Sequence, residues 1–252
     1  MIEIKNTVLI IAAGMGSRLR PYTSQTPKSI IDINGMTMLG QSLFNLNEIN
    51  NSDNIIIDKV LICIGYLKEK IKQYVNSLEL KNINVEFIEN PLYATLNNNF
   101  SVWLAHSHIT DQQLVLINGD IFYDKQILIS TFLSRYENLS VIDSTKPLPE
   151  DGMKVLVNDE NRIIAFSKTY YNGFGCTVGI HKFSTEGTSL FLKKIYDHLE
   201  NGINTFHHKA IDDLIKSNEL DHYALDVNGF EWIEIDDVTD LQSAKENYFE
   251  EL

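Results

Sequence analysis

Apolar runs alternate with amphipathic stretches through the first half of the chain. Four runs rich in Val, Ile and Leu stand at residues 7–13, 58–65, 83–88 and 113–118. Such runs are typical of strands that are buried on both faces of a parallel sheet. The intervening segments predict helices at about 37–50, 66–77 and 98–109, with an Asn as cap of the third. The repeated order of strand and helix predicts an α/β fold with a Rossmann-like mixed, mostly parallel sheet and helices on both faces.

The second half has shorter spacing between its apolar segments. Strands are predicted at 153–159, 162–168, 176–183, 222–227 and 231–236, and helices at 184–200, 206–218 and 237–250. The chain shows no linker or repeat, so we expect a single domain over residues 1–252. Within it we expect a nucleotide-binding half (1–144), an acceptor-binding region (145–230), and a returning strand with a C-terminal helix (231–252). The stretch STKPLPEDG, residues 144–152, is expected to form a loop over a site.

Composition excludes several classes of partner. The net charge is −13, which disfavours nucleic acid and anionic membrane surfaces as partners. No apolar run approaches the roughly 18 residues of a membrane span, and the start MIEIKNTVLII does not have the pattern of a signal peptide. Cys63 and Cys176 both lie in apolar runs. We therefore expect a cytoplasmic protein with two buried, free thiols.

The loop after the first apolar run carries the most specific pattern in the chain. Residues 14–28 read G-x-G-x-R-L-x-P-x-T-x-x-x-P-K. Backbone N–H groups of a glycine loop that follows a strand can approach a phosphate or a base closely. Leu19 stands where the dinucleotide fingerprint has its third glycine, and the P-loop spacing is absent. Both observations disfavour the NAD-type and P-loop alternatives.

The same loop has cations but no carboxylates. No Asp or Glu occurs from residue 4 to residue 31, whereas Arg18, Arg20 and Lys28 do. A nucleoside triphosphate carries about four negative charges and a phosphorylated acceptor about two, so fixed cations reduce the repulsion between them. We expect Arg18 to bind phosphate oxygens through its planar fork, and Lys28 to neutralise charge at the α-phosphate. The role of Arg20 stays open.

This pattern resembles the signature of the nucleotidyltransferases that join an NTP to a phosphorylated small molecule and release pyrophosphate. Later segments are similar to further landmarks of that family, in the same order: NPLYATLNNNFSVWLA (90–105), LINGDIF (116–122) and WIEIDDVTDL (232–241). Among its members, the chain most resembles the bacterial CTP:phosphocholine cytidylyltransferase-like enzymes. The resemblance implies a nucleotide-diphospho-sugar transferase-like fold, and CTP and a small phosphorylated metabolite as substrates.

Two aspartates are candidates for a metal site. Asp120 and Asp236 each end an apolar run, at the edge where α/β sheets place ligands. The resemblance implies that both bind the metal and that Arg18, Lys28, Asp120 and Asp236 form the catalytic set. Carboxylates suit Mg²⁺, and Mn²⁺ is expected to substitute for it. One shared ion requires the two strands to lie side by side; Asp237 could instead cap the last helix.

The resemblance also implies which residues meet the nucleotide. They are Ala12, Ala13, Gly14, Gly16, Ser17, Arg18, Asn97, Asn98 and Ser101. The segment NPLYATLNNNFS lacks the glycine of the Q-P-x-G-x-A stretch with which sugar-nucleotide members read the base. This departure weakens the case for a hexose 1-phosphate with UTP, dTTP or GTP, and it favours CTP.

The region expected to bind the acceptor differs from a choline-binding site, because a lysine stands at a position where an aromatic residue of a choline-binding cage is expected. The predicted acceptor-binding residues are Lys154, Lys168, Tyr170 and Asp212. By analogy with the family the acceptor is phosphoglutamine or a phosphocholine-like ester, and the CDP-linked product would serve a surface polysaccharide or lipid. The alternatives are a hexose-1-phosphate nucleotidylyltransferase and a non-catalytic nucleotide sensor. A homodimer is the prior expectation for such enzymes.

The seven histidines show no metal-binding spacing, and we expect them to form no metal set. For His207 and His208 a position at a helix start or on the surface is favoured over contact with an acceptor, and their roles stay open.

Overall fold

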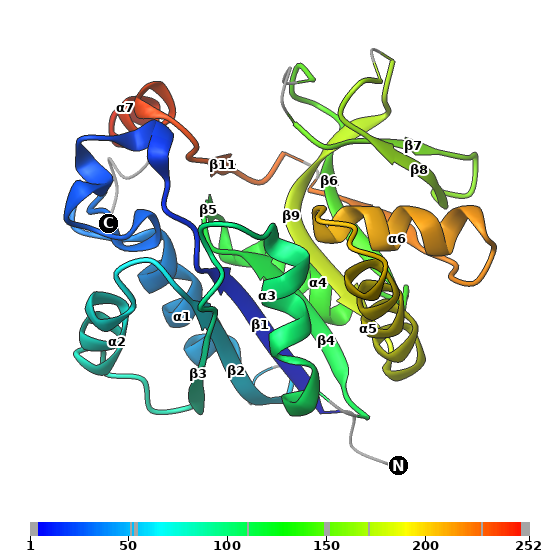
Figure 1. Cartoon of the computed structure of the whole chain (residues 1–252). Coiled ribbons are helices and arrows are strands. Elements are labelled where there is room, and N and C mark those ends of the chain that lie inside the picture. The colour runs from blue at the N-terminus through cyan, green and yellow to red at the C-terminus, as the bar shows by residue number, and fades with distance from the viewer. Residues whose placement is uncertain are drawn as a thin grey trace.

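The structure is a computed structural model of the whole chain, in which one twisted sheet forms the centre of the molecule (Figure 1). It describes residues 5–50, 52, 55–109, 111–148, 152–170, 172–227 and 229–247. The nine strands of the sheet are β1 (Asn6–Ala12), β2 (Ile57–Ile64), β3 (Val85–Glu89), β4 (Gln113–Asn118), β6 (Leu139–Asp143), β7 (Lys154–Val157), β8 (Ile163–Ser167), β9 (Gly175–Phe183) and β10 (Tyr223–Asp226). Their order is β10-β6-β9-β4-β1-β2-β3, and the β7–β8 hairpin joins the end of β9.

The first four strands of the sheet pair in parallel, whereas β9, from the second half of the sequence, is antiparallel to both of its neighbours in the sheet order. β1 pairs in parallel with β2 and β4, and β2 pairs in parallel with β3. β9 runs antiparallel between β4 and β6. The sheet is therefore mixed and mostly parallel, as the sequence predicts, and β9 of the second half lies inside it.

Helices cover both faces of the sheet. They are α1 (Met38–Ile49), α2 (Lys68–Asn76), α3 (Asn98–Leu104), α4 (Lys125–Leu133), α5 (Thr185–Glu200), α6 (His207–Lys216) and α7 (Val238–Asn247), with short 3₁₀ turns η1 (Ser17–Leu19), η2 (Tyr22–Ser24), η3 (Lys28–Ile30) and η4 (His106–His108). Alternate residues of β1 point to opposite sides: Val8 and Ile10 pack with α1, α2 and α4, whereas Leu9 packs with α3, α5 and α6. The two faces thus carry separate apolar cores, which explains the unbroken apolar runs of the inner strands.

A third apolar core lies beyond the end of the sheet. It joins the glycine loop to a small antiparallel sheet of β5 (Ile121–Tyr123) and β11 (Trp232–Glu234), and to α7. Its buried members are Leu19, Ile31, Ile33, Met38, Phe122, Ile235, Leu241 and Ala244. Segments from the beginning, middle and end of the chain are held together here, and each of them carries a predicted site residue.

The elements differ from the prediction in several places. The helix predicted over 98–109 ends at Leu104 and is followed by η4, and Asn97 stands at its N-cap without a side-chain cap bond. α4, β5 and β6 are additional, and β11 belongs to the small sheet rather than to the main one. Of the last predicted helix, residues 248–250 lie outside the described residues. Cys63 and Cys176 are buried and free, as expected.

Candidate active site

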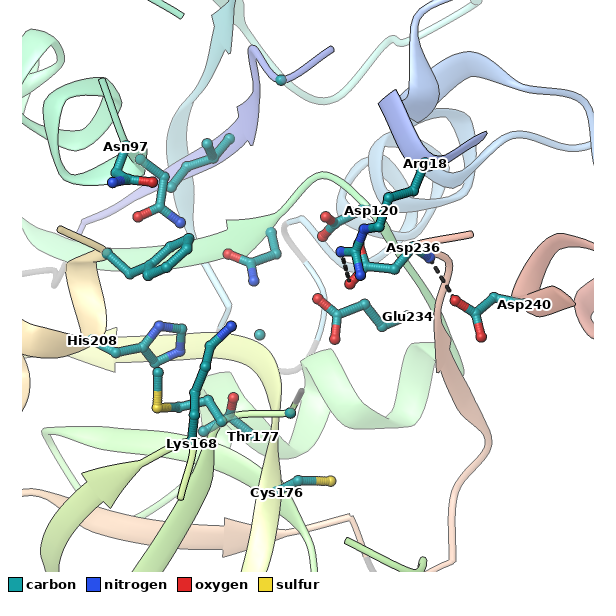
Figure 2. Close-up of a pocket in the computed structure, with 18 of the residues that line it drawn as sticks. Arg18, Asn97, Asp120, Lys168, Cys176, Thr177, His208, Glu234, Asp236 and Asp240 are labelled. Atoms are coloured by element: carbon teal, nitrogen blue, oxygen red, sulfur yellow. Dashed lines mark hydrogen bonds and ion pairs between the residues drawn. The ribbon is translucent and has the colours of Figure 1, made fainter. Parts of the chain in front are cut away.

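A cavity of about 650 Å³ opens beyond the carboxyl ends of β1 and β4. Its lining includes Ala13 and Gly14 after β1, Asn90 after β3, Asn97, Asn98 and Ser101 around the start of α3, Cys176 and Thr177 of β9, Phe206 and His208 at the start of α6, and Trp232 to Glu234 of β11. Lys146, Pro147 and Gly152 also line it, so the stretch 144–152 borders the site as predicted; residues 149–151 lie outside the described residues. Figure 2 shows Asp120, Glu234, Asp236 and Arg18 together at one end of the cavity; away from them, Asn97 lies on one side and His208 with Lys168 on another.

The small β5–β11 sheet brings the two predicted aspartates together. Asp120 directly precedes β5, and Asp236 lies two residues beyond β11. Because the strands are antiparallel, with Glu234 opposite Ile121, the start of one lies beside the end of the other. The Ile235 N–H donates to the Asp120 carbonyl at 2.9 Å. The requirement that the two segments lie side by side is therefore met.

Lys28 lies between the two carboxylates. Its Nζ is 2.9 Å from Asp120 Oδ2 and 2.6 Å from Asp236 Oδ1, and its side chain is 13 % exposed. Burial by itself would lower the pKa of Lys28, but the charges of Asp120 and Asp236 outweigh burial and raise it above its usual value. Lys28 is therefore a fixed cation at neutral pH.

Arg18 approaches the same cluster from the exposed side. Its guanidinium lies 2.8 Å from Asp236 Oδ2. Burial acts to raise the pKa of Asp236, but the charges and hydrogen bonds of Lys28 and Arg18 prevail and lower it. Arg20 is exposed.

The glycine loop folds so that Lys28 can reach this position. Gly16 has a φ of +58°, and a Cβ there would lie 2.9 Å from Lys28 Cβ. The Gly16 carbonyl accepts a hydrogen bond of 2.8 Å from Thr23 Oγ1. Only glycine takes this backbone angle at low cost while leaving room for the lysine stem.

Glu234 is a third carboxylate of the cluster, and the sequence interpretation missed it. Single oxygens of Asp120, Glu234 and Asp236 lie within 4.8 Å of one another. Burial, together with the charges of Asp120 and Asp236, raises the pKa of Glu234 to about 8. The alternation of side chains along a strand could have identified Glu234, because residues 232, 234 and 236 share one face of an extended segment.

These three residues form a donor set that suits a hard divalent cation. Carboxylate oxygens are the ligands that Mg²⁺ prefers. Asp120 Oδ1 is buried and makes no hydrogen bond to any described residue, so it has an unused acceptor site. The carboxylate set therefore fits a divalent metal, with Lys28 as the counter-charge on its inner side.

Three polar residues of the α3 end line the far part of the cavity. Asn98 Oδ1 accepts from the His207 N–H at 2.9 Å, and the Asn97 N–H donates to Asn204 Oδ1 at 2.7 Å. Ser101 Oγ accepts from Asn90 Nδ2 at 2.9 Å. Asn90 is a buried residue that the sequence interpretation missed. These bonds hold the Asn98 and Ser101 side chains, and the Asn97 side chain is held by its own bond from Nδ2 to the Asn204 carbonyl at 3.3 Å.

The structure divides the predicted nucleotide residues into two groups. Ala13, Gly14, Arg18, Asn97, Asn98 and Ser101 line the cavity. Ala12, Gly16 and Ser17 are not among the described lining residues. Gly16 shapes the loop instead, whereas Gly14 has open space around its Cα and borders the cavity directly.

The predicted acceptor residues also separate. Lys168 lines the cavity, with its Nζ 4.9 Å from the centre of the Phe206 ring. Lys154 and Asp212 are buried outside the lining: Lys154 Nζ donates to the Lys168 carbonyl at 2.7 Å, and Asp212 accepts from the Phe166 N–H at 3.0 Å. Tyr170 is not among the described lining residues either. Of the four, Lys168 alone borders the described cavity.

Lys146 is a cation of the cavity that the sequence interpretation did not single out. Its Nζ lies 4.5 Å from the centre of the Trp232 ring and donates to the Trp232 carbonyl at 2.5 Å. Trp232 Nε1 in turn donates to the buried Asp143 at 2.7 Å. Burial lowers the pKa of Lys146. No composition or spacing signal marked this lysine, because it stands in a loop.

Comparison with known proteins shows the family of the chain. A family model described as nucleotidyl transferase matches residues 7–150. The chain belongs to the nucleotidyl transferase family. This membership confirms the family resemblance that the glycine loop indicated. It excludes the alternative of an NAD-type dinucleotide-binding protein.

Curated relatives of this nucleotidyl transferase include two cytidylyltransferases. Choline-phosphate cytidylyltransferase of Streptococcus pneumoniae is 25 % identical over 94 % of this chain and 96 % of its own length. The 2-aminoethylphosphonate cytidylyltransferase of Lancefieldella rimae is 25 % identical over 97 % of this chain and 94 % of its own. Bifunctional protein GlmU of Methanocaldococcus jannaschii is 26 % identical over 87 % of this chain, which spans only 50 % of that relative.

Solved structures show the same fold. CTP:phosphocholine cytidylyltransferase of Streptococcus pneumoniae superposes with a TM-score of 0.74 at 21 % identity, over 96 % of this chain and 99 % of that one. UDP-glucose pyrophosphorylase gives a TM-score of 0.75 at 13 % identity, over 97 % and 98 % of the two chains. The predicted nucleotide-diphospho-sugar transferase-like architecture of this nucleotidyl transferase is confirmed.

Asp237, which follows Asp236 in the sequence, caps the last helix, the role that the sequence analysis left open. Its Oδ1 accepts from the Thr239 and Asp240 N–H groups at 2.7 and 3.0 Å, directly before α7.

Among the described helices, none has both the length and the apolar content that crossing a bilayer demands.

Proposed function

We propose that this chain is a CTP-dependent cytidylyltransferase that transfers CMP to a small phosphorylated or phosphonate acceptor and releases pyrophosphate. The observation that carries the proposal is the cluster of Lys28, Arg18 and the carboxylates of Asp120, Glu234 and Asp236 at one end of a deep cavity. The two full-length cytidylyltransferase relatives support the choice of CTP and of a small acceptor.

The reaction consists of one in-line displacement. A phosphate oxygen of the acceptor attacks the α-phosphorus of CTP and forms a new P–O bond, and the bond to the bridging α–β oxygen breaks. Its electron pair leaves with pyrophosphate. A phosphate monoester has its second pKa near 6 and is already an anion at neutral pH, so no general base is needed. The task of the protein is alignment and charge stabilisation.

Lys28 and Arg18 supply the positive charge that two anionic reactants require. In this proposal Lys28 faces the α-phosphate as charge develops on it, and Arg18 binds oxygens of the leaving pyrophosphate. Gly14, Asn97, Asn98 and Ser101 border the space for the nucleoside. An amide can donate to and accept from a base or a ribose.

Asp120, Glu234 and Asp236 would hold Mg²⁺, and Mn²⁺ would substitute for it. When bound, the ion supplies charge neutralisation and orients phosphate oxygens. Full activity in the presence of EDTA would remove the metal from the proposal.

The acceptor binds, in this proposal, in the half of the cavity that contains Lys168 and Lys146. Two ammonium groups there suit the acceptor phosphate or an acceptor with a further negative charge. Phosphoglutamine and phosphocholine-like esters are the first candidates, and 2-aminoethylphosphonate joins them because of the relative that is named for it. A CDP-linked product of this kind would serve a surface polysaccharide or lipid.

The decisive experiment is a matrix of nucleotides and acceptors. The purified chain is incubated with Mg²⁺, each of the four NTPs and a panel of phosphorylated metabolites, and both pyrophosphate and the new conjugate are measured. We expect turnover with CTP, loss of it in Asp236→Asn, and retention in Asp124→Asn. Asp124 caps α4 outside the cavity, with its side chain accepting from the Gln126 N–H, and asparagine preserves this cap.

A hexose-1-phosphate nucleotidylyltransferase is the second candidate. The GlmU relative and the likeness to UDP-glucose pyrophosphorylase favour it. Turnover with UTP or dTTP and a hexose 1-phosphate, but not with CTP, would establish it. Binding of CTP without turnover over the whole panel would indicate a nucleotide sensor. A homodimer and a cytoplasmic location stay predictions, and the first is checked by light scattering in solution.

A further inference from the structure

Three histidines meet inside the protein at the acceptor end of the cavity. His181 comes from β9, in the centre of the sheet, and His207 and His208 begin α6. The ring of His181 lies with its centre 5.2 Å from that of His207 and 5.0 Å from that of His208. One nitrogen of each ring lies within 4.8 Å of the others. The structure thus brings together three histidines that no spacing in the sequence connects. His207 and His208 stand at a helix start, as favoured, but they are buried rather than on the surface.

The ring nitrogens of this cluster lack protein partners. His181 and His207 have no exposed surface and His208 is 7 % exposed. Both ring nitrogens of His207 and of His208, and Nε2 of His181, are buried without a hydrogen bond to any described residue. Buried polar atoms in folded proteins nearly always have a partner, so such a concentration of unpartnered nitrogens points to a group bound between them.

A fourth histidine and a serine orient the first ring. Ser140 Oγ lies 2.6 Å from His181 Nδ1 and 2.8 Å from His222 Nε2. When His181 Nδ1–H donates to Ser140, and the serine hydroxyl donates to His222, the lone pair of His181 Nε2 points into the cluster. Histidine ligands of metals are commonly oriented by such a bond from their second nitrogen.

We propose that His181, His207 and His208 bind one transition-metal cation of the zinc class, at a site separate from the carboxylate cluster. Imidazole nitrogen suits Zn²⁺, Cu²⁺ and Ni²⁺, whereas the oxygens of Asp120 and Asp236 suit Mg²⁺. Three protein ligands leave a fourth position for water or a substrate atom. His208 also lines the cavity, which gives the ion a path of entry.

The rings must approach one another slightly to close this site. Ligands of a tetrahedral zinc with bonds of about 2.0–2.1 Å lie about 3.4 Å apart, against the upper limit of 4.8 Å here. Because the χ2 torsion of histidine has a broad energy well, we expect rotation of the imidazoles to bring the nitrogens closer when an ion binds.

The charged group that faces the cluster is Lys168. Its positive charge acts on His208 and lowers the pKa of that ring, and the same charge opposes a bound cation. Lys168→Met is therefore expected to tighten metal binding, whereas a merely packed histidine cluster would not respond. An anion bound between Lys168 and the ion would offset the repulsion, which connects this site to the acceptor end of the cavity.

The test measures binding directly, on the full chain without a histidine tag and in an excess of Mg²⁺. We expect one equivalent of Zn²⁺ by calorimetry and a tetrahedral d–d absorption with Co²⁺. Ser140→Ala should weaken the affinity by roughly 10–100-fold and His207→Gln by more. His106→Gln is the matched control, because His106 is exposed on η4 and binds the Trp103 carbonyl at 2.7 Å.

Three results would overturn the proposal. They are absence of saturable Zn²⁺ or Co²⁺ binding to the wild-type chain, unchanged binding in His207→Gln, and loss of binding in Asp236→Asn, which would assign the ion to the carboxylates. If His207→Gln does not fold, the stoichiometry and the Co²⁺ spectrum of the wild type still decide the question.

Discussion

Lys28 is the residue on which the proposed chemistry depends. Its ammonium is the buried cation between Asp120 and Asp236, and Arg18 contacts the same cluster from outside. In a cavity of low dielectric, a fixed charge directed at the reacting phosphate stabilises the transition state far more than a mobile ion in water.

Lys28→Met is expected to lower kcat by about 10²–10³-fold, the magnitude typical of removing one transition-state donor. Pyrophosphate release under saturating substrates is the measurement. Lys193→Met on the exposed face of α5, where the side chain is 72 % exposed, serves as the control and should keep wild-type turnover. A Lys28→Met variant with full kcat would remove this residue from the chemistry.

Asp143 is the buried residue that anchors the cavity wall. Its carboxylate accepts from Trp232 Nε1 at 2.7 Å and from the Thr145 N–H at 2.8 Å. Burial opposes its ionisation, but the hydrogen bonds from Thr145, Trp232 and the Lys146 N–H prevail and lower the pKa of Asp143 below 3.8. Asp143→Ala should therefore reduce the free energy of unfolding by roughly 1.5–3 kcal/mol at pH 7, as for other hydrogen bonds to charged groups.

The pH dependence of this contribution has a definite sign. Because the folded-state pKa of Asp143 is depressed, its stabilisation is present above the unfolded value of 3.8 and is lost as the pH falls through the folded value. The difference in unfolding free energy between the wild type and Asp143→Asn should therefore shrink as the pH falls below 3.8. Urea titrations at pH 7 and at pH 3 measure it, and a difference that is equal at both contradicts the assignment.

At the scale of elements, the turn between β4 and β5 determines where Asp120 lies. Gly119 passes so close to β1 that a Cβ there would lie 2.4 Å from the Ile11 carbonyl oxygen and 3.1 Å from Ala12 Cα. The Gly119 N–H also donates to that carbonyl, at 2.9 Å. The turn thus has no room for a side chain.

Gly119→Ala is expected to displace this turn, because the methyl group would meet backbone atoms of Ile11 and Ala12, which cannot rotate away. We expect a loss of roughly 1–3 kcal/mol in stability, as for other overpacked sites, together with a lower kcat from a misplaced Asp120. Thermal unfolding and turnover of the same preparation separate the two effects. Unchanged Tm and kcat would show that the turn tolerates a methyl group.

The elements show what a single sequence can and cannot predict. The apolar runs of β1, β2 and β4 are buried on both faces, so the pattern alone identifies them. α4 was missed because residues 125–133 are apolar on most sides and show weak helical periodicity. Glu234 was missed although strand alternation places it on the face of Asp236, since an acidic residue in an apolar run reads as solvent-exposed.

At the scale of the whole molecule, the charge of the chain is distributed unevenly. The net charge is −13, yet Arg18, Lys146 and Lys168 line the cavity and Lys28 lies behind it. A small anion responds to this local field rather than to the total charge. The acid-free stretch at the start of the chain predicted Arg18 and Lys28, and Lys168 was predicted as an acceptor-binding residue. Lys146 was not predicted, because its place depends on which loop the fold brings to the cavity.

The contact between histidines that are distant in the sequence could not be predicted either, because the fold decides which segments meet. His181 and His207 are separated by a strand end, the whole of α5 and a turn, and no local spacing connects them. The antiparallel course of β9 through the middle of the sheet sets their contact. The pairing of Asp120 with Asp236 was predicted only because the family resemblance implied that both bind the metal.

The two thiols should report on the stability of the whole fold. Burial raises the pKa of Cys63 and of Cys176 to about 11, and the thiolate is the reactive form. Iodoacetamide at pH 8 is therefore expected to label neither thiol appreciably in the native protein and both in urea. Peptide mass mapping should show faster labelling of Cys176, which borders the cavity, than of Cys63. Rapid native labelling of Cys63 would contradict its burial.

The pairing of β5 with β11 has a consequence for biosynthesis. Asp120 is synthesised well before Glu234 and Asp236, because most of the second half of the fold lies between them in the sequence. A nascent chain can form most of the central sheet long before the three carboxylates of the cluster can come together. If the proposed function holds, the metal site is therefore complete only after β11 has been synthesised, and a chain cut short after β10 is expected to lack turnover.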